Sequence, residues 1–84
     1  MADKKNIIGD RLRIARNFAK PKVTQLDLSA RLQLQGVMIG DSTIGKIEQG
    51  TSAVTDIQLV AFSKALNVNA LWLLGPDENM SNNR

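Results

Sequence analysis

The chain has 84 residues, which suits one small domain and leaves no room for a separate domain that senses a small-molecule effector. Its composition, 43% hydrophobic and 23% charged, predicts a folded protein. The chain contains no cysteine and no histidine. This excludes disulfides, thiolate or imidazole catalysis and the usual zinc sites, so we expect neither a metal nor a cofactor. No apolar run is long enough for a signal peptide or a membrane span, so we expect a cytoplasmic protein.

The net charge of +3 is unevenly distributed along the chain. Residues 1–31 carry a net charge of +5, and residues 32–84 carry −2. The basic part is a candidate phosphate-facing surface. Lysine and arginine on an ordinary solvated helix give the same pattern, and on charge alone that is the better interpretation.

Apolar residues recur at helical spacing from the beginning of the chain. Those three or four positions apart are Ile8, Leu12, Ala15 and Phe18. This spacing predicts a first helix from about Asn6 to Phe18. Pro21 then ends the helical segment, because proline lacks a backbone donor and disfavours helical geometry in the residue before it.

Four later helix starts share one signature, in which an apolar residue precedes a capping residue and a second apolar residue follows four positions after the cap. The caps are Thr24, Gly40, Thr55 and Asn69. Asp27 and Gln58 add candidate capping boxes to the two threonines. The predicted helices are residues 25–32, 41–49, 56–66 and 70–74. Gly50 and Gly75 suit the ends of two of them.

Five helices and no predicted strand indicate an all-α fold, a compact five-helix bundle formed by residues 1–75, with residues 76–84 as a flexible tail. The expected core residues are Leu12, Leu28, Leu32, Ile44, Ile47, Leu59, Phe62, Leu66, Leu71 and Trp72.

The predicted helix 41–49 has a polar outer face. Because Ile44 and Ile47 must face the core, the outward residues are Asp41, Ser42, Gly45, Lys46 and Gln49. Short polar side chains allow a helix to enter a major groove and contact base edges. Any amphipathic surface helix has a polar stripe, so the stripe alone is weak evidence for DNA binding.

With its neighbouring motifs, this helix resembles the Cro and phage-repressor type of helix-turn-helix regulators, the XRE family. The resemblance runs from about Ile8 to Leu74. It depends on RLRIAR at 11–16, TQxxL at 24–28, STIxKIExG at 42–50 and LVAFSKALNVNALWLL at 59–74. It implies a lambda-repressor-like domain whose second and third helices form the helix-turn-helix, and sequence-specific binding of double-stranded DNA.

The resemblance also implies roles for individual residues. The expected DNA-binding residues are Gln25, Gly40, Asp41, Ser42, Thr43, Gly45, Lys46, Gln49, Thr51 and Ser52. Gln25 is expected to be exposed and to hold a phosphate together with its helix N-terminus. Exposed Lys46 is expected to contact guanine or a phosphate. Arg16 and Glu48 match a structural ion pair that joins the first and third helices.

Three features depart from the family pattern. The turn Gln33–Gly40 is several residues longer, and its Val37 and Met38 either pack onto the core or lie exposed near DNA. Asp41 would repel phosphates unless it accepts a hydrogen bond from a cytosine amine. Gly45 costs about 1 kcal/mol within a helix relative to alanine, which hints at close approach to another group.

One such domain contacts few base pairs, so we expect a homodimer that acts as a repressor. Leu71 or Leu73 is a candidate dimer contact, although the segment around Trp72 could instead complete the monomer core. The alternative function is a protein-binding module, an antitoxin or adaptor that keeps the fold while DNA contact is weakened. We do not expect an enzyme, because the chain lacks a glycine-rich phosphate loop and paired carboxylates on one helix face.

Overall fold

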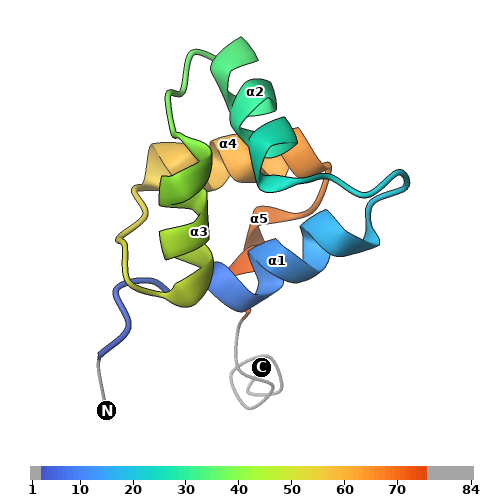
Figure 1. Cartoon of the computed structure of the whole chain (residues 1–84). Coiled ribbons are helices and arrows are strands. Elements are labelled where there is room, and N and C mark those ends of the chain that lie inside the picture. Colours follow the sequence, from blue (N-terminus) through green and yellow to red (C-terminus); the bar gives the residue numbers. More distant parts are fainter. Residues whose placement is uncertain (1–2, 76–84) are drawn as a thin grey trace.

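The computed structural model describes residues 3–75. The expected tail, residues 76–84, lies outside the described residues. Five helices follow one another along the chain, and residues 3–75 contain no strand, which confirms the all-α prediction (Figure 1). They are α1 (Gly9–Phe18), α2 (Gln25–Leu34), α3 (Asp41–Gln49), α4 (Asp56–Leu66) and α5 (Ala70–Leu74).

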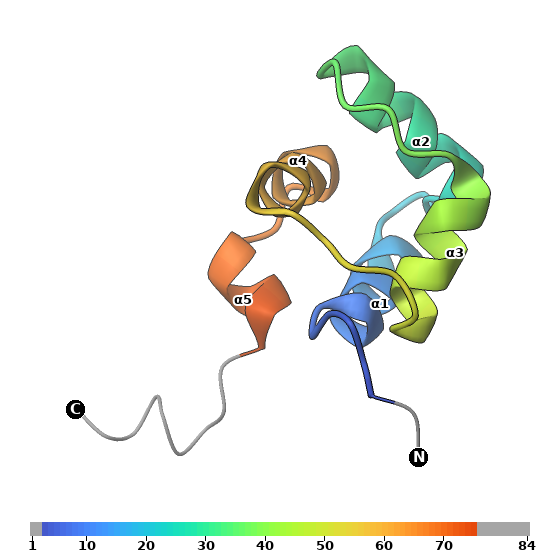
Figure 2. The same ribbon diagram turned by 90° about the vertical axis from the view of Figure 1, so that its left-hand side faces the viewer.

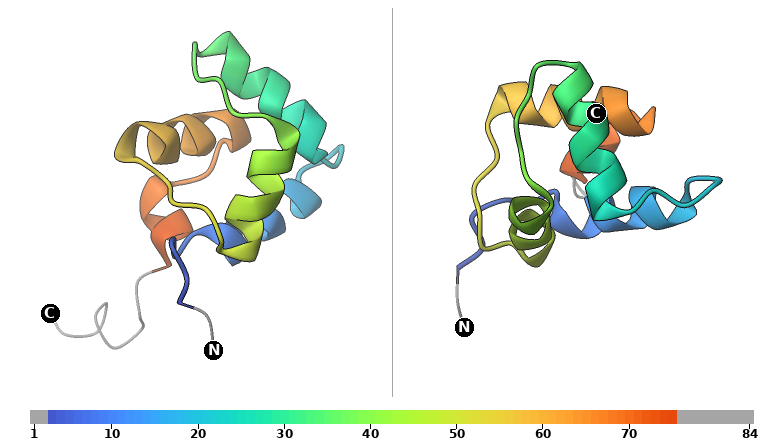
Figure 3. Two further views of the ribbon diagram at one scale, coloured as in Figure 1. Left: turned by 60° about the vertical axis from the view of Figure 1, so that its left-hand side comes forward. Right: turned by 45° about the horizontal axis from the view of Figure 1, so that its top comes forward.

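The helices form two sides of the molecule, which are joined by α1 and by the packing of α2 on α4. α2 and α3 pack together on one side, while α4 and α5 lie on the other (Figures 2 and 3). α1 contacts α3, α4 and α5. Within residues 3–75, we find no helix whose length and hydropathy would allow it to cross a membrane.

Both predicted capping boxes are present. Thr24 Oγ1 accepts a hydrogen bond from the Asp27 N–H at 3.0 Å, and the Asp27 carboxylate accepts from the Thr24 N–H at 3.1 Å. Thr55 and Gln58 exchange the same two bonds at 3.1 and 3.0 Å. These contacts satisfy N–H groups that have no partner within the first helical turn, and so they determine where α2 and α4 begin.

The Thr24–Asp27 box makes stability depend on pH. The backbone N–H of Thr24, and then its hydroxyl, lower the pKa of the Asp27 carboxyl by hydrogen bonding. A group whose pKa is lower in the folded state stabilises the fold above its unfolded pKa, and this stabilisation is lost as the pH falls through the folded pKa. Asp27→Asn should therefore have a lower free energy of unfolding than wild type at pH 7. The difference in unfolding free energy between the two proteins, the gap, should become smaller below about pH 4. Urea unfolding of both proteins at several pH values measures this gap, and a gap independent of pH would contradict the prediction.

α1 begins at Gly9, three residues after the predicted start at about Asn6. Asn6 instead precedes the helix, and its Oδ1 accepts hydrogen bonds from the N–H groups of Ile8 at 3.0 Å and Gly9 at 2.9 Å. α2 also differs from its predicted range, because it continues two residues past Leu32 to Leu34.

The core is built from all five helices and from the apolar residues that precede their caps. Its buried members are Ile8, Leu12, Ala15, Val23, Leu28, Leu32, Ile39, Ile44, Ile47, Ala61, Phe62, Leu66 and Leu73.

The core prediction was wrong at the end of the chain. Leu71 is 61% exposed and Trp72 is also exposed, whereas Leu73 is fully buried. Successive residues of a helix are about 100° apart, so a helix as short as α5 turns only one of these side chains inward. Phe18, predicted on the apolar face of α1, is exposed at the last position of that helix, and Leu59 is only half-buried.

Candidate nucleic-acid interface

The outer face of α3 is polar and open to solvent. Ile44 and Ile47 are fully buried, which leaves Asp41, Ser42, Lys46 and Gln49 exposed and Thr43 and Gly45 half-buried. Gly40, extended at the N-cap position, and Thr51 after the helix are also exposed, and Ser52 is half-buried. The helix ends at Gly50, whose φ of +83° favours glycine.

The first turn of α2 lies beside the middle of α3. A β-carbon added at Gly45 would lie 3.5 Å from Nε2 of Gln25, which is ordinary van der Waals contact. The group close to Gly45 is therefore Gln25. The fold thus places Gln25 next to the predicted DNA-binding residues of α3, although Gln25 is 16 positions before Asp41, the first residue of that helix.

A buried network centred on Glu48 connects α1, α2 and α3. Arg16 donates from Nε to Glu48 Oε2 at 2.6 Å and from Nη2 to Oε1 at 2.9 Å, and only 7% of Arg16 and 5% of Glu48 is exposed. Arg16 Nη1 donates to the Val23 carbonyl at 3.0 Å. In residues 3–75, every buried side-chain nitrogen and oxygen has a hydrogen-bond partner. The two-bond geometry makes this a directional contact that holds α3 against α1.

Gln25 is part of the same network, which corrects the prediction that it is exposed. Its Nε2 donates to Glu48 Oε1 at 3.1 Å, and the residue is half-buried. The carboxylate of Glu48 attracts the amide because it still has lone pairs free after binding Arg16. A glutamine amide has two N–H donors and one oxygen, so one donor and the oxygen remain for another partner.

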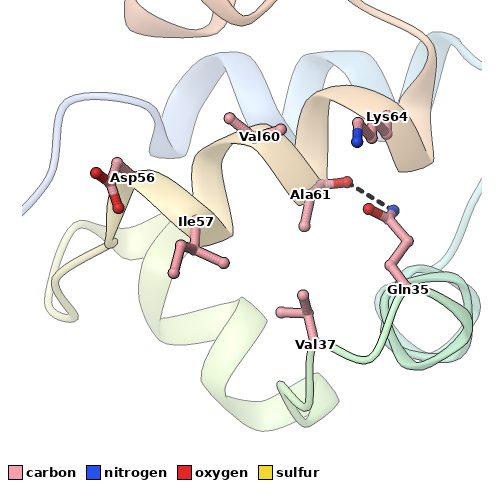
Figure 4. A pocket seen from close by; sticks show the side chains of 7 residues that line it. All are labelled: Gln35, Val37, Asp56, Ile57, Val60, Ala61 and Lys64. Atoms are coloured by element: carbon pink, nitrogen blue, oxygen red, sulfur yellow. Dashed lines mark hydrogen bonds between the residues drawn. The ribbon is translucent and has the colours of Figure 1, made fainter.

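The long turn between α2 and α3 is held in place by hydrogen bonds. Ser29 Oγ donates to the Ile39 carbonyl at 2.6 Å, and Gln35 Nε2 donates to the Ala61 carbonyl of α4 at 3.0 Å (Figure 4). Gly36 has a φ of +79°, which permits the sharp change of direction after α2.

The two apolar residues of the turn, Val37 and Met38, lie in different environments. Val37 packs partly against the core, and Figure 4 shows it across a shallow hollow from Ile57 of α4. Met38 is 74% exposed. The turn is thus joined to α4 through Gln35, and it leaves one methionine on the surface.

A family model described as helix-turn-helix matches residues 12–73, most of the chain. The protein belongs to the XRE-type helix-turn-helix family. Comparisons with curated proteins and with solved structures give no match. As a member of this family, the protein is a helix-turn-helix DNA-binding regulator. The domains of this family are regulatory and not typically enzymatic.

The sequence of this XRE-type protein did not predict the roles of Asn6 and Gly9 in the contact between α1 and α3. Asn6 donates from Nδ2 to the carbonyls of Ile47 at 2.9 Å and Ser52 at 2.7 Å, and so joins the start of α1 to the end of α3. Gly9 is buried where the same two helices meet. An asparagine side chain often bonds to backbone N–H groups a few residues further along the chain, so Asn6 was a usable signal that the helix begins after it. No local signal marks Gly9, because its neighbours come from a distant part of the chain.

Proposed function

We propose that the protein is a dimeric repressor that binds a specific double-stranded DNA site with α3 in the major groove. The observation that carries this proposal is the exposed polar face of α3 next to the first turn of α2, both held by the buried Glu48 network. A groove-binding helix must be presented at a defined angle, and a network that joins three helices provides that rigidity.

In this proposal, the residues of α3 divide into base and backbone contacts. Ser42 and Lys46 face base edges, with Lys46 donating to the acceptors of guanine. Asp41 accepts from a cytosine amine, which avoids repulsion by the phosphates. Gly45, which lies beside Gln25, adds no side chain to this face of the helix. The contacts to the sugar-phosphate backbone come from Gly40, Thr43, Gln49, Thr51 and Ser52.

Gln25 has a double role in this proposal. Its bond to Glu48 orients the side chain, and the remaining N–H joins the free N–H groups at the start of α2 to hold a phosphate. A phosphate contact of this kind determines the register of the protein on DNA without selecting sequence.

The proposed dimer contact is apolar. Leu73 is fully buried and is not available to a partner, whereas Leu71 is exposed. Ile14, Phe18 and Trp72, which are also exposed, line one apolar hollow formed by α1, the end of α4 and α5. Burial of this surface against a second copy would remove it from water. A dimer on DNA prevents other proteins from contacting the same base pairs, which is the proposed basis of repression.

The test of groove binding is Lys46→Ala, preceded by selection of bound sequences from random duplex DNA with the wild-type protein. Loss of one good base contact should weaken binding by about 1–3 kcal/mol, a factor of about 5 to 160, and the proposed dimer loses this contact in each half-site. The melting temperature should stay near that of wild type, because Lys46 is exposed. Affinity measured by fluorescence anisotropy reports the change.

Lys64→Ala is the matched control, because Lys64 is an exposed lysine on α4, a helix outside the proposed DNA-binding face. Equal effects of the two substitutions would contradict the assignment of Lys46. If the wild-type protein selects no sequence and its binding is independent of salt, the protein-binding alternative replaces DNA recognition.

A further inference from the structure

The segment before α1, residues 3–8, lies against the end of α3 and is called here the leading segment. Its main chain is bonded to that helix end, because the Lys5 N–H donates to the Gly50 carbonyl at 2.8 Å. Asn6 adds the two side-chain bonds to Ile47 and Ser52. The leading segment is thus attached to the last turn of α3 and to the loop that follows it.

This attachment places two lysines beside the end of the polar face. The stem of Lys4 lies over Gly50, since a β-carbon added there would be 3.2 Å from Lys4 Cγ. Lys4 and Lys5 are both exposed. Gly50 separates Gln49 from Thr51, two of the residues assigned to the DNA backbone above. Figure 2 shows the leading segment beneath the end of α3, on the side of the molecule formed by α2 and α3.

The charges around these lysines leave them available to an anion. Lys4 Nζ is 3.7 Å from Asp10 Oδ2, and both side chains are 64% exposed. Arg13 shares the same carboxylate at 3.4 Å. An exposed pair of this kind contributes little in water, so it does not commit the lysine to Asp10. Together, Lys4, Lys5 and Arg13 with Asp3 and Asp10 have a net charge of +1.

We propose that the leading segment is a second DNA-contacting element, in which Lys4 and Lys5 bind phosphates next to the base pairs contacted by α3. This inference rests on the proposed function. Asn6 is a positioning residue, since it acts by holding the segment against α3 rather than by touching DNA. Each lysine that neutralises a phosphate releases condensed counterions, so each adds to the salt dependence of binding.

The experiment measures affinity for the selected duplex over a range of KCl concentrations. The variants are Lys4→Gln, Lys5→Gln and the double variant, with Lys64→Gln as the matched loss of one positive charge on α4. Because the proposed dimer carries each lysine twice, each single substitution should reduce the magnitude of the slope of log K against log salt by about 1.8, and the double variant by about twice that. Lys64→Gln should leave the slope unchanged. The selected sequence should also stay the same, because phosphate contacts do not specify bases.

Equal slopes for the double variant and the wild type would overturn the role of the leading segment while leaving DNA binding by α3 intact. A wild-type protein that selects no DNA sequence would instead overturn the proposed function itself. The two failures are therefore distinguishable in one set of titrations.

Asn6→Asp tests the positioning role separately. The aspartate keeps an oxygen that accepts from Ile8 and Gly9, but it has no donor for the carbonyls of Ile47 and Ser52. The magnitude of the slope of log K against log salt should be smaller in Asn6→Asp than in wild type. Adding the two lysine substitutions to Asn6→Asp should reduce this magnitude by less than the same substitutions do in the wild-type protein. If the lysine substitutions reduce the slope by the same amount in Asn6→Asp as in wild type, Asn6 does not position the lysines.

Discussion

Replacing Glu48 with alanine is expected to lower the free energy of unfolding by about 3–5 kcal/mol. The carboxylate accepts two hydrogen bonds from Arg16 and one from Gln25 in a site that is almost closed to water. Alanine would leave the guanidinium of Arg16 buried with only the Val23 carbonyl as a partner. Small domains have a total stability of about 5–15 kcal/mol, so this single change removes a large share of it.

The measurement is urea unfolding followed by circular dichroism, or thermal melting for a variant that is already partly unfolded. The control is a variant with both charges removed, Arg16→Met with Glu48→Leu. Because a buried ion pair can be replaced by apolar residues of similar size, the double variant should recover most of the stability lost in Glu48→Ala. An unchanged melting temperature in Glu48→Ala would show that the network contributes little to folding.

Gly9→Ala is expected to destabilise the protein by about 1–3 kcal/mol, the usual cost of overpacking a core. The added methyl carbon would lie 2.5 Å from the Ile47 carbonyl oxygen and 2.8 Å from that of Glu48. Both are backbone atoms in the last turn of α3, so relief of the contact requires α1 and α3 to move apart. That movement would also strain the Arg16–Glu48 pair, which joins the same two helices.

Gly45→Ala is the control for this prediction, because it is also a glycine-to-alanine change in a helix. A methyl carbon there meets the Gln25 side chain at 3.5 Å, without overlap. Alanine is favoured over glycine within a helix by about 1 kcal/mol, so this variant should be as stable as wild type or more stable. Chemical denaturation compares the two variants, and a Gly9→Ala protein as stable as Gly45→Ala would exclude close packing at Gly9 as a constraint.

The helices, their caps and their order were predictable because these features depend on residues a few positions apart. The Thr24–Asp27 and Thr55–Gln58 boxes are examples, since each joins positions separated by three. The family motifs were also visible, and they predicted the Arg16–Glu48 pair across 32 positions only because the resemblance supplied the partner.

Contacts between distant segments were not predictable in the same way. The start of α1 depends on Asn6, whose amide also contacts backbone atoms 41 and 46 positions away. The choice of Leu73 over Leu71 and Trp72 for the core depends on the angle at which α5 meets the other helices. The bond from Gln25 to Glu48 required the relative placement of α2 and α3.

The amino-acid sequence by itself determined a five-helix domain with a polar third helix, because periodicity and capping act over one or two helical turns. Only the tertiary structure decided that Gln25 shares Glu48 with Arg16, that Val37 turns inward while Met38 does not, and that the leading segment lies against α3. The physical reason is that side-chain orientation and backbone contact across the core depend on how the helices pack, which no short segment of the chain specifies.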